Sequence, residues 1–327
     1  MDRWFSKLIK NSRKVIIACH QNADPDAICS MFLLLKLLKK LKRKLYVEVI
    51  TPTVSRVSRG VLERIKIKLT QSPSIEKSDA IFIVDTNTTQ QLGPLKERIE
   101  NSNKPIVFID HHTPHPFTKK IAYMIIYDEK VSSSCELIFH LFNLFNLKIS
   151  KNEALATLIG IVYETKHFAL ASSKTFITIA KLISCGAMVE EAVKILKMPM
   201  PQPEKIARLK AAQRMQIWRL KDWIAVTSEV GSYHASAARG LVMLGADVAI
   251  VGSEEKGKIK ISLRSNKEFF EKSKVHLGRD IAIPVGDFMN GMGGGHALAA
   301  SINGSGNVEL GIKKCMELLT IKLNFNY

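Results

Sequence analysis

Three short runs rich in Val and Ile, each followed directly by a polar residue, constrain the fold of this chain more than any other feature. The runs over 15–19, 81–84 and 106–109 are typical of buried strands. Apolar residues at helical spacing over 26–42 separate the first run from the second. Strands that alternate with helices favour an α/β fold built on a parallel sheet. Two further strands are expected over 45–50 and 122–127.

Carboxylates and imidazoles stand directly after each of the three strands. Open parallel sheets bind ligands outside the carboxyl ends of their strands, so these side chains are expected to converge on one edge. Taken singly, each has an ordinary structural explanation; Asp24, for example, is a suitable N-cap for the following helix. The convergence of three strands is what indicates a functional site. The members of this set are His20, Asp24, Asp26, Asp85, Asp110 and His111.

This set of donors suits divalent metal ions. Carboxylates with a few imidazoles favour Mn²⁺ or Mg²⁺, whereas a structural zinc site favours thiolates. The set is larger than one ion with an open coordination position requires. Two ions about 3.5–4 Å apart, bridged by one carboxylate, would use it fully and form a clamp for the hydrolysis of phosphate esters.

Composition limits the class of protein. The 327 residues suffice for about two domains, and 46% hydrophobic with 24% charged residues exclude a disordered chain. The formal net charge of +18 favours a polyanionic partner, although a solvated basic surface would show the same bias. No stretch of about 20 apolar residues predicts a membrane span. Five cysteines without a CxxC pair fit a reducing cytoplasm, which is the expected location.

The order of these motifs resembles that of the DHH phosphoesterases. HxxxDxD after the first strand, IVD at the second and IDHH at the third look like the first three motifs of that family. The similarity continues through SSSCEL (132–137) and GIVYETKHF (160–168). LRS (263–265) and GMGGGHALAAS (291–301) resemble the DHHA1 substrate domain. The nanoRNase and pAp-phosphatase branch is the most similar subgroup, with RecJ-like exonucleases and cyclic-dinucleotide phosphodiesterases as related groups.

The resemblance implies a two-domain α/β architecture. A DHH domain over 1–197 would carry the parallel sheet, its flanking helices and the metal ions. A smaller mixed α/β DHHA1 domain over 219–327 would bind the substrate, with the active site in the cleft between the two domains. Three prolines within 198–203 and a charged helix over 204–218 are expected to form the connection, 198–218.

Roles for individual residues follow from the resemblance. His20, Asp24 and Asp85 would hold one ion, and Asp85 would bridge to a second. Asp110 would orient a neighbouring ligand or imidazole. His112 would contact the phosphate or donate a proton to the leaving oxygen. The remaining ligands of the second ion would be Asp26, His111 and Glu164. The ions are expected to be Mn²⁺, with Mg²⁺ as the alternative.

Glu164 marks a departure from the family pattern. The family has Asp followed by Thr-Gly where this sequence has Glu164, Thr165 and Lys166. The additional methylene of Glu164 shifts the ligand oxygen, so we expect metal binding to be retained with altered geometry. The alternative is a weakened second site and a slower or non-catalytic protein.

Arg264 and a glycine-rich segment are the candidates for substrate binding in the C-terminal part. Arg264 follows a strand expected over 258–263, and a guanidinium can hold a phosphate with two hydrogen bonds. The glycines are expected to form a loop of backbone N–H groups before a helix of small residues. The resemblance assigns to the substrate Arg264, Ser265, Gly293, Gly294, Gly295 and His296.

Four functions are compatible with this interpretation. The first is Mn²⁺-dependent hydrolysis of short single-stranded RNA or DNA, or of nucleotides such as pAp. Cleavage of a cyclic dinucleotide such as c-di-AMP and RecJ-like exonuclease action use the same metal site. The fourth belongs to another class, a nucleic-acid-binding scaffold with a vestigial metal site. A homodimer fits each of them, and none requires a membrane.

Overall fold

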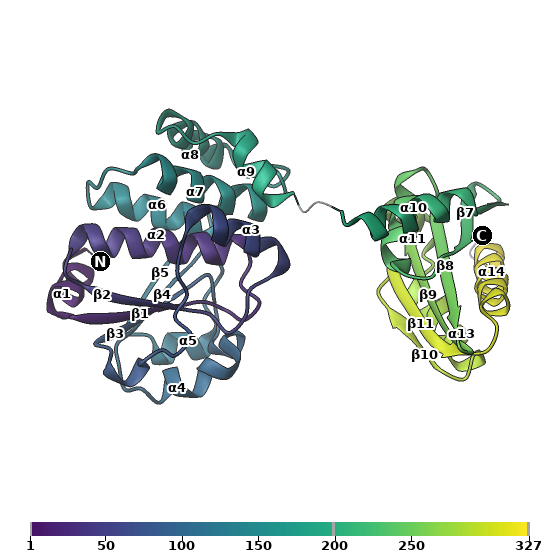
Figure 1. The fold of residues 1–327 in the computed structure, drawn as a ribbon, viewed down its shortest axis with the longest axis horizontal. Helices are drawn as coiled ribbons and strands as arrows, with labels where there is room; N and C mark the ends of the chain where they lie inside the picture. Colours follow the sequence, from purple (N-terminus) through teal and green to yellow (C-terminus); the bar gives the residue numbers. More distant parts are fainter. Residues whose placement is uncertain (1, 198–199, 326–327) are drawn as a thin grey trace. The chain divides into compact units, whose positions relative to one another are not determined.

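The computed structural model describes residues 2–197 and 200–325, and the chain forms two compact units, Met1–Met198 and Pro199–Tyr327 (Figure 1). Each unit has its own sheet and its own hydrophobic core. The first two residues of the connection predicted over 198–218 lie outside the described residues. No helix in the described part of the chain is long and apolar enough to cross a membrane.

A five-stranded parallel sheet forms the centre of the N-terminal unit, which confirms the fold predicted from the strand–helix alternation. Its strands are β1 (Lys14–Ala18), β2 (Tyr46–Ile50), β3 (Ala80–Val84), β4 (Ile106–Asp110) and β5 (Met124–Tyr127). They lie in the order β2-β1-β3-β4-β5, and every neighbouring pair is parallel. The order of the chain reverses between β1 and β3, and sheets of this topology bind ligands at the carboxyl ends of the strands that flank such a reversal.

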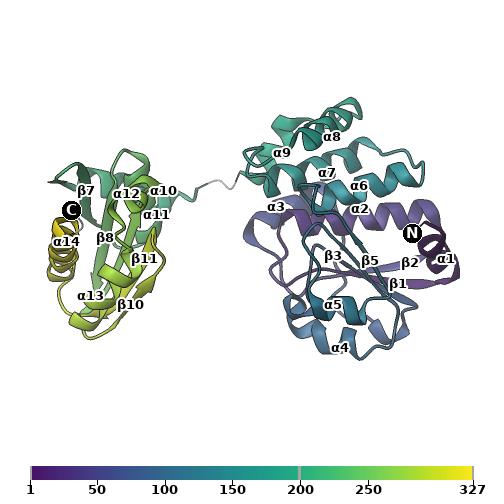
Figure 2. The same cartoon turned by 180° about the vertical axis from the view of Figure 1, so that it is seen from behind.

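Helices surround this sheet. They are α1 (Asp2–Asn11), α2 (Pro25–Leu41), α3 (Arg56–Ile65), α4 (Lys96–Glu100), α5 (Pro116–Ile121), α6 (Ser134–Leu144), α7 (Lys151–Glu164), α8 (Ser173–Ser184) and α9 (Val189–Leu196), with the 3₁₀ turns η1 (Ile75–Lys77) and η2 (Thr89–Leu95). One face of the sheet packs against α2, α6 and α7, and the other against η2, α4 and α5 (Figures 1 and 2). Residues that follow one another in β1, such as Ile16 and Ile17, are therefore buried on opposite faces. Strands buried on both faces give the continuous apolar runs seen in the sequence.

Helix α2 begins at the carboxyl edge of the sheet because of its cap. Asp24 accepts a hydrogen bond from the backbone N–H of Ala27 at 3.0 Å, and Pro25 occupies the first helical turn. The same turn contains Asp26, which is fully buried. The cap thus fixes both aspartates of the HxxxDxD motif close to the end of β1.

A six-stranded sheet forms the centre of the C-terminal unit. Its strands are β6 (Gln216–Leu220), β7 (Trp223–Glu229), β8 (Val248–Glu255), β9 (Lys258–Ser265), β10 (Met292–Gly295) and β11 (Ala299–Ser305). They lie in the order β10-β11-β9-β8-β7-β6; β7 and β8 are parallel and the other pairs antiparallel. This confirms the mixed α/β character predicted for the second domain.

Two groups of helices cover the two faces of this second sheet (Figure 1). On one face lie α10 (Gln202–Gln213) and α11 (His234–Met243), which pack through small residues such as Ala211 and Ala238. On the other lie α12 (Lys267–Ser273), the π-helical turn η3 (Leu277–Ala282), α13 (Ile283–Phe288) and α14 (Val308–Phe325).

The helix expected over 204–218 is shorter than the sequence predicts. Helix α10 ends at Gln213, and from Gln216 the chain forms the edge strand β6. This strand pairs with β7 across a two-residue turn in which Lys221 has a φ of 53°. Hairpin pairing between β6 and β7 therefore overrides the local helical pattern.

The glycine-rich segment forms a strand, and the expectation of a loop before a helix is wrong. Residues 293–295 belong to β10, and the small residues that follow form β11. A Cβ atom on Gly293 would overlap the carbonyl of Ala282, and one on Gly295 would overlap the backbone of Ala299. Glycine is required because β10 approaches η3 and β11 closely. A Cβ atom on Gly294, in contrast, would meet nothing within 4 Å.

A substitution in α7 tests how tightly the core closes under the edge of the N-terminal sheet. A Cβ atom on Gly160 would overlap the sulfur of Cys135 and a carboxylate oxygen of Asp26. We expect Gly160→Ala to lower the free energy of unfolding by about 1–3 kcal/mol, because overpacking outweighs the better helix propensity of alanine. Urea denaturation measures this change.

Gly240→Ala in α11 is the matched control. The added Cβ atom would meet only the flexible side chain of Arg208. This variant is expected to be neutral or stabilised by up to about 1 kcal/mol. Equal stability changes in the two variants would contradict close packing at Gly160.

Candidate metal centre

The carboxyl ends of three neighbouring strands bring five of the predicted residues to one edge of the N-terminal sheet. β3 lies between β1 and β4. His20 and Asp24 follow β1, Asp85 follows β3, and Asp110 with His111 stand at the end of β4. These are the strands at and beside the reversal of strand order, where the topology predicts a ligand site.

Asp85 lies at the centre of this edge. Its Oδ2 atom is 3.8 Å from Nε2 of His20, and its Oδ1 atom is 4.0 Å from Nε2 of His111. Burial alone would raise the pKa of Asp85, but the neighbouring His20 and His111 hold this pKa below its usual range. Asp85 is therefore an anion with one imidazole facing each carboxylate oxygen.

The backbone of Asp85 is held in an uncommon conformation. Its φ of 51° lies in the left-handed region, which Asp and Asn adopt more readily than most residues. Its N–H donates to the carbonyl of Ile109 at 3.0 Å, which ties the residue to β4. Backbone strain of this kind concentrates at functional sites, where the surrounding structure holds it in place.

Two sets of possible metal ligands share Asp85. In each set, one donor atom from every residue lies within 4.8 Å of the others. A carboxylate common to both sets is what a pair of bridged ions requires. The first set is His20, Asp24 and Asp85; the second is Asp85, Asp110, His111 and His112.

Buried polar atoms without partners show that these residues fit divalent ions. Among the described residues, Oδ2 of Asp110 and Nε2 of His111 are buried and have no hydrogen-bond partner. Leaving such a group unpaired costs about 1–3 kcal/mol. A divalent cation would satisfy Nε2 of His111 directly, and the mixture of oxygen and nitrogen donors around it suits Mn²⁺ or Mg²⁺.

Hydrogen bonds orient the first set. Nδ1 of His20 lies 2.8 Å from the carbonyl oxygen of Gln21, to which it can donate, and Nε2 faces Asp85. Burial lowers the pKa of His20, but the hydrogen bond to Asp85 outweighs this effect and raises the pKa to about 9. A cation bound at Nε2 would therefore have to displace a proton at neutral pH. Asp24 caps α2 with Oδ1, which leaves Oδ2 available.

Asp26 is held differently from the other carboxylates. Its two oxygens accept hydrogen bonds from the backbone N–H groups of Ser134, at 2.8 Å, and Cys135, at 3.1 Å. It belongs to neither set of donors. These bonds join the start of α6 to the start of α2, and the assignment of Asp26 as a metal ligand stays a prediction.

Ser134 is a site residue that the sequence analysis did not single out. Its hydroxyl donates to Oδ1 of Asp85 at 2.9 Å and lies 3.4 Å from Oδ1 of Asp110. The hydroxyl thereby orients the central carboxylate from the first turn of α6. The available signal was the SSSCEL motif, in which Ser133 is the N-cap and accepts from the N–H of Glu136 at 3.0 Å.

Asp110 and His112 form a pair beside a cavity of about 260 Å³. Nδ1 of His112 lies 2.9 Å from Oδ1 of Asp110, and this hydrogen bond raises the pKa of His112 to about 9. The imidazole is therefore protonated at neutral pH. The lining of the cavity includes two polar residues, Asn87 and Gln91, that the sequence analysis did not name. The cavity is lined by His20, Asp24, Asp85, Asn87, Gln91, His112 and Glu164.

Glu164 ends α7 and lines this cavity, but it belongs to neither set of donors. Burial and the charge of Asp85 raise its pKa. Lys166, His167 and Phe168 follow with φ values of 50°, 57° and 70°. A left-handed conformation costs roughly 1–2 kcal/mol per residue outside glycine, so this turn is strained. The role of Glu164 as a metal ligand stays a prediction.

Arg264 and Ser265 lie at one end of β9 in the C-terminal unit. The guanidinium of Arg264 donates to the carbonyl of Leu263 at 2.7 Å. Burial and the nearby Arg239 of α11 lower its pKa, and neither arginine has an ion-pair partner in the described part of the chain. The hydroxyl of Ser265 is buried without a hydrogen-bond partner among those residues. Two guanidinium groups without an ion-pair partner and a free hydroxyl fit an anionic ligand.

The glycines and His296 approach the same end of β9 through β11. Gly295 pairs with Ala300, and Arg264 pairs with Ala299, across the strand order β10-β11-β9. His296 is exposed, and its N–H donates to the carbonyl of Ala299 at 2.8 Å. The structure therefore brings the predicted substrate residues together on the C-terminal unit.

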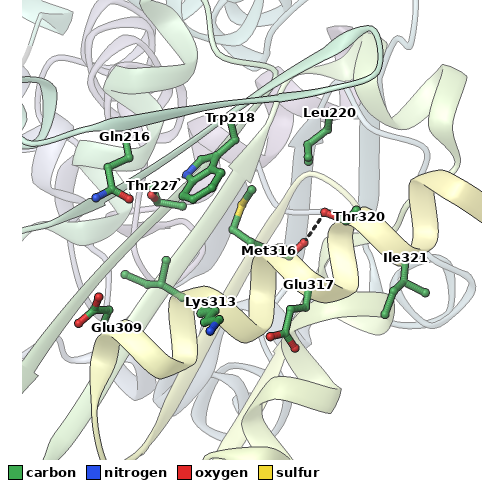
Figure 3. A pocket seen from close by; sticks show the side chains of 11 residues that line it. Gln216, Trp218, Leu220, Thr227, Glu309, Lys313, Met316, Glu317, Thr320 and Ile321 are labelled. Atoms are coloured by element: carbon green, nitrogen blue, oxygen red, sulfur yellow. Dashed lines mark hydrogen bonds between the residues drawn. The ribbon is translucent and has the colours of Figure 1, made fainter.

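A larger cavity in the same unit lacks the chemistry of a reaction site. Its volume is about 660 Å³, and it lies between β6 and α14 (Figure 3). Trp218 lies above it and donates from its indole N–H to Thr227 at 3.1 Å, while Met316 and Ile321 line it from α14. The carboxylates of its lining, Glu309 and Glu317, belong to neither set of possible metal ligands, so the smaller cavity beside Asp85 is the candidate reaction site.

Comparison with known proteins assigns the family. The sequence profile described as the DHH family, N-terminal domain, matches residues 14–161. An uncharacterized protein of Methanocaldococcus jannaschii is 34% identical over 296 residues, which are 89% of this chain and 87% of that protein. The chain belongs to the DHH family of phosphoesterases.

Two further similarities bear on activity and fold. The cyclic-di-AMP phosphodiesterase GdpP of Bacillus subtilis is 26% identical over 314 residues, which are 92% of this chain but 46% of the relative. The chain therefore spans about half the length of that enzyme. An exopolyphosphatase-related protein from Bacteroides fragilis superposes with a TM-score of 0.64 at 20% identity, covering 99% of this chain and 96% of that protein. This second similarity shows a shared fold.

Metal binding by Asp85→Asn tests the shared carboxylate. Asn tolerates the left-handed backbone of Asp85, so this variant removes the charge and little else. We expect the two Mn²⁺ sites to be reduced to at most one, with an affinity at least about 10-fold weaker. Isothermal titration with Mn²⁺ measures both quantities. The exposed Asp287→Asn is the control, and an unchanged stoichiometry in Asp85→Asn would contradict the bridge.

Proposed function

We propose that the protein is a Mn²⁺-dependent phosphoesterase that hydrolyses short single-stranded oligonucleotides or nucleotide phosphate esters such as pAp. The observation that carries the proposal is Asp85, which belongs to both sets of donors and faces His20 with one oxygen and His111 with the other. Membership in the DHH family and the basic net charge of +18 support it.

The two metal sites are proposed to divide the ligands as follows. His20, Asp24 and Asp85 would hold the first ion. Asp85 and His111 would hold the second, with Asp26 and Glu164 completing its coordination. When bound, the two ions would activate a water molecule and neutralise the charge of the phosphate oxygens. Ser134 keeps Asp85 in the orientation that serves both sites, through its hydrogen bond to Oδ1.

His112 is proposed as the proton donor to the leaving oxygen. Its imidazole carries a proton at neutral pH because of the hydrogen bond from Nδ1 to Asp110. That bond fixes the ring, and Nε2 is the nitrogen left for the substrate. Asp110 acts through His112 and through its contact with Ser134, so it is a positioning residue.

Substrate binding is proposed for the C-terminal unit. Arg264 would hold a phosphate, helped by the charge of Arg239. The hydroxyl of Ser265, which has no partner among the described residues, would donate a hydrogen bond to a phosphate or sugar oxygen. His296 and the open backbone at Gly294 would contact the remainder of the nucleotide, where no side chain blocks approach. Gly293 and Gly295 would shape this surface by allowing β10 to pack closely.

Cleavage of a cyclic dinucleotide is the second candidate. One relative named cyclic-di-AMP phosphodiesterase, GdpP of Bacillus subtilis, matches 92% of this chain, and thus both units. The proposed metal site would serve this reaction equally well, because oligonucleotides and cyclic dinucleotides contain the same phosphodiester bond. Rates of hydrolysis measured against a panel of substrates decide which substrate is preferred.

Product analysis against a substrate panel tests the proposed function. The panel contains pAp, c-di-AMP, pApA, a five-residue RNA and a 25-residue single-stranded DNA. With Mn²⁺ we expect AMP and inorganic phosphate from pAp and AMP from pApA, with both reactions abolished by EDTA and slowed about 10³-fold or more in Asp85→Asn. Faster cleavage of c-di-AMP than of pApA would favour the second candidate. Absence of turnover, together with salt-sensitive binding of the 25-residue DNA, would contradict both and favour a scaffold.

Two substitutions test Glu164 separately from the rest of the site. Glu164→Gln removes the charge, and we expect the affinity of the weaker Mn²⁺ site to fall about 10–100-fold if Glu164 is a ligand. Glu164→Asp restores the family residue and is expected to keep that affinity within about 10-fold. Titration with Mn²⁺ measures both. Unchanged binding in Glu164→Gln would exclude Glu164 as a ligand, and a loss in Glu164→Asp would show that the longer side chain fits better.

A further inference from the structure

A basic cavity lies at the far end of β9 from Arg264. Its volume is about 480 Å³, and it opens between the β8–β9 hairpin and the start of α11. This volume lies within the range of small-ligand sites. The cavity is lined by Gly231, Ser232, Tyr233, His234, Ser253, Glu255, Lys256, Lys258 and Lys260.

The charge of this cavity is unbalanced. Lys256, Lys258 and Lys260 contribute three positive charges, and Glu255 contributes the one carboxylate of the lining. None of the three lysines forms an ion pair with another described residue. Clustered ammonium groups repel one another unless an anion lies between them, so the cavity attracts an anionic ligand.

One lysine of this cavity occupies a position that favours another residue. Lys256 and Gly257 form a two-residue turn between β8 and β9, with φ values of 51° and 72°. Two positive φ values are typical of a type I′ turn, in which Asn-Gly is strongly preferred. Lys256 therefore destabilises the turn relative to asparagine. Its side chain adds a positive charge to the cavity.

His234 and Tyr233 add hydrogen-bonding and stacking capacity. Nε2 of His234 is buried and has no hydrogen-bond partner in the described part of the chain. Burial and the charge of Lys260 lower its pKa, and a hydrogen bond to the carbonyl of Val230 holds the ring. The phenol ring of Tyr233 is 40% exposed beside it. A free imidazole nitrogen and an aromatic face are the contacts that a sugar hydroxyl and a base can use.

A row of side chains links this cavity to Arg264. Successive side chains in a strand point to opposite faces, so Lys258, Lys260, Ser262 and Arg264 share one side of β9. The intervening Ile259, Ile261 and Leu263 belong to the core on the other side, and within the row Ser262 is buried while Lys258 and Lys260 are exposed. Six residues of strand span about 20 Å. At about 3.4 Å per stacked nucleotide this distance corresponds to roughly six nucleotides.

We propose that the cavity between the β8–β9 hairpin and α11 is a second phosphate-binding site for nucleotides, separated from Arg264 by the length of β9. The phosphate has two possible sources, namely the distal part of an oligonucleotide whose other end lies at Arg264, or a separate mononucleotide. Lys258 and Lys260 contact its oxygens, Lys256 adds charge, and Tyr233 and His234 contact the attached base and sugar. The nucleotide character of the ligand rests on the proposed function.

Binding by the full chain in EDTA tests this site independently of hydrolysis. Fluorescently labelled oligo(A) of two and of eight residues are the probes, read by anisotropy over a range of salt concentrations. In Lys258→Gln/Lys260→Gln we expect the octamer affinity to fall at least 10-fold at low salt. The slope of log affinity against log salt should fall by about 1.4, since each phosphate contact on a single strand contributes about 0.7. Dinucleotide binding should be unchanged, because two nucleotides do not span β9.

Matched variants separate this site from general basicity and from misfolding. Lys205→Gln/Lys210→Gln removes the same charge from exposed positions of α10 and should change the octamer affinity less than 2-fold. Lys258→Arg/Lys260→Arg should retain it. Lys256→Asn should raise the melting temperature by improving the turn and still weaken binding, a combination that a purely structural role does not produce.

The outcomes distinguish the two sources and the failure of the proposal. Equilibrium dialysis with AMP should detect a site that Lys258→Gln/Lys260→Gln loses if the ligand is a separate mononucleotide, with octamer binding unaffected. Loss of octamer affinity alone assigns the site to an extended substrate. The proposal is overturned if Lys258→Gln/Lys260→Gln equals Lys205→Gln/Lys210→Gln in binding both the octamer and AMP. Because no metal is present, a protein without hydrolytic activity would still give a clear result.

Discussion

The carboxylate of Asp85 is the group on which the rest of the candidate site depends. It stands after the central of three adjacent parallel strands, with His20 facing one oxygen and His111 facing the other. A left-handed backbone and the hydroxyl of Ser134 hold it there. The two imidazoles lie beside Asp85 because β3 is placed between β1 and β4 in the sheet. The fold thus serves mainly to place one anion between two sets of donors.

The parts of the fold and site that could be predicted are those that local chemistry determines. Buried parallel strands give unbroken apolar runs, so β1, β3 and β4 were visible, and with them the polar residues at their carboxyl ends. Asp24 caps α2 as its position before Pro25 suggests. The grouping of His20, Asp24, Asp85 and His111 follows from these two facts and from the rule that parallel strands share a carboxyl edge.

Contacts between distant segments account for what the sequence analysis missed. Asp26 accepts hydrogen bonds from backbone groups more than 100 residues away, and Ser134 reaches Asp85 from another helix. Neither contact has a local signature. The error at β10 has the same origin. Gly293 must be glycine because a Cβ atom would overlap the carbonyl of Ala282 in η3, not because the chain turns there. The segment from Gln216 became a strand through pairing with β7, which periodicity within it does not reveal.

The two units carry complementary chemistry. The N-terminal unit gathers carboxylates and imidazoles on one sheet edge, and the C-terminal unit carries Arg264 and two lysines on β9, with Arg239 of α11 near Arg264. Acidic residues that bind cations and basic residues that bind phosphates are the two requirements of a metal-dependent phosphoesterase.

The most direct test of this account is a crystal structure of the protein grown with Mn²⁺, with anomalous diffraction recorded at the manganese edge. The account predicts two anomalous peaks about 3.5–4 Å apart, one on each side of Asp85, the first beside His20 and the second beside His111. A single peak that Asp85 does not contact, or no peak at this edge of the sheet, would contradict the central role of Asp85.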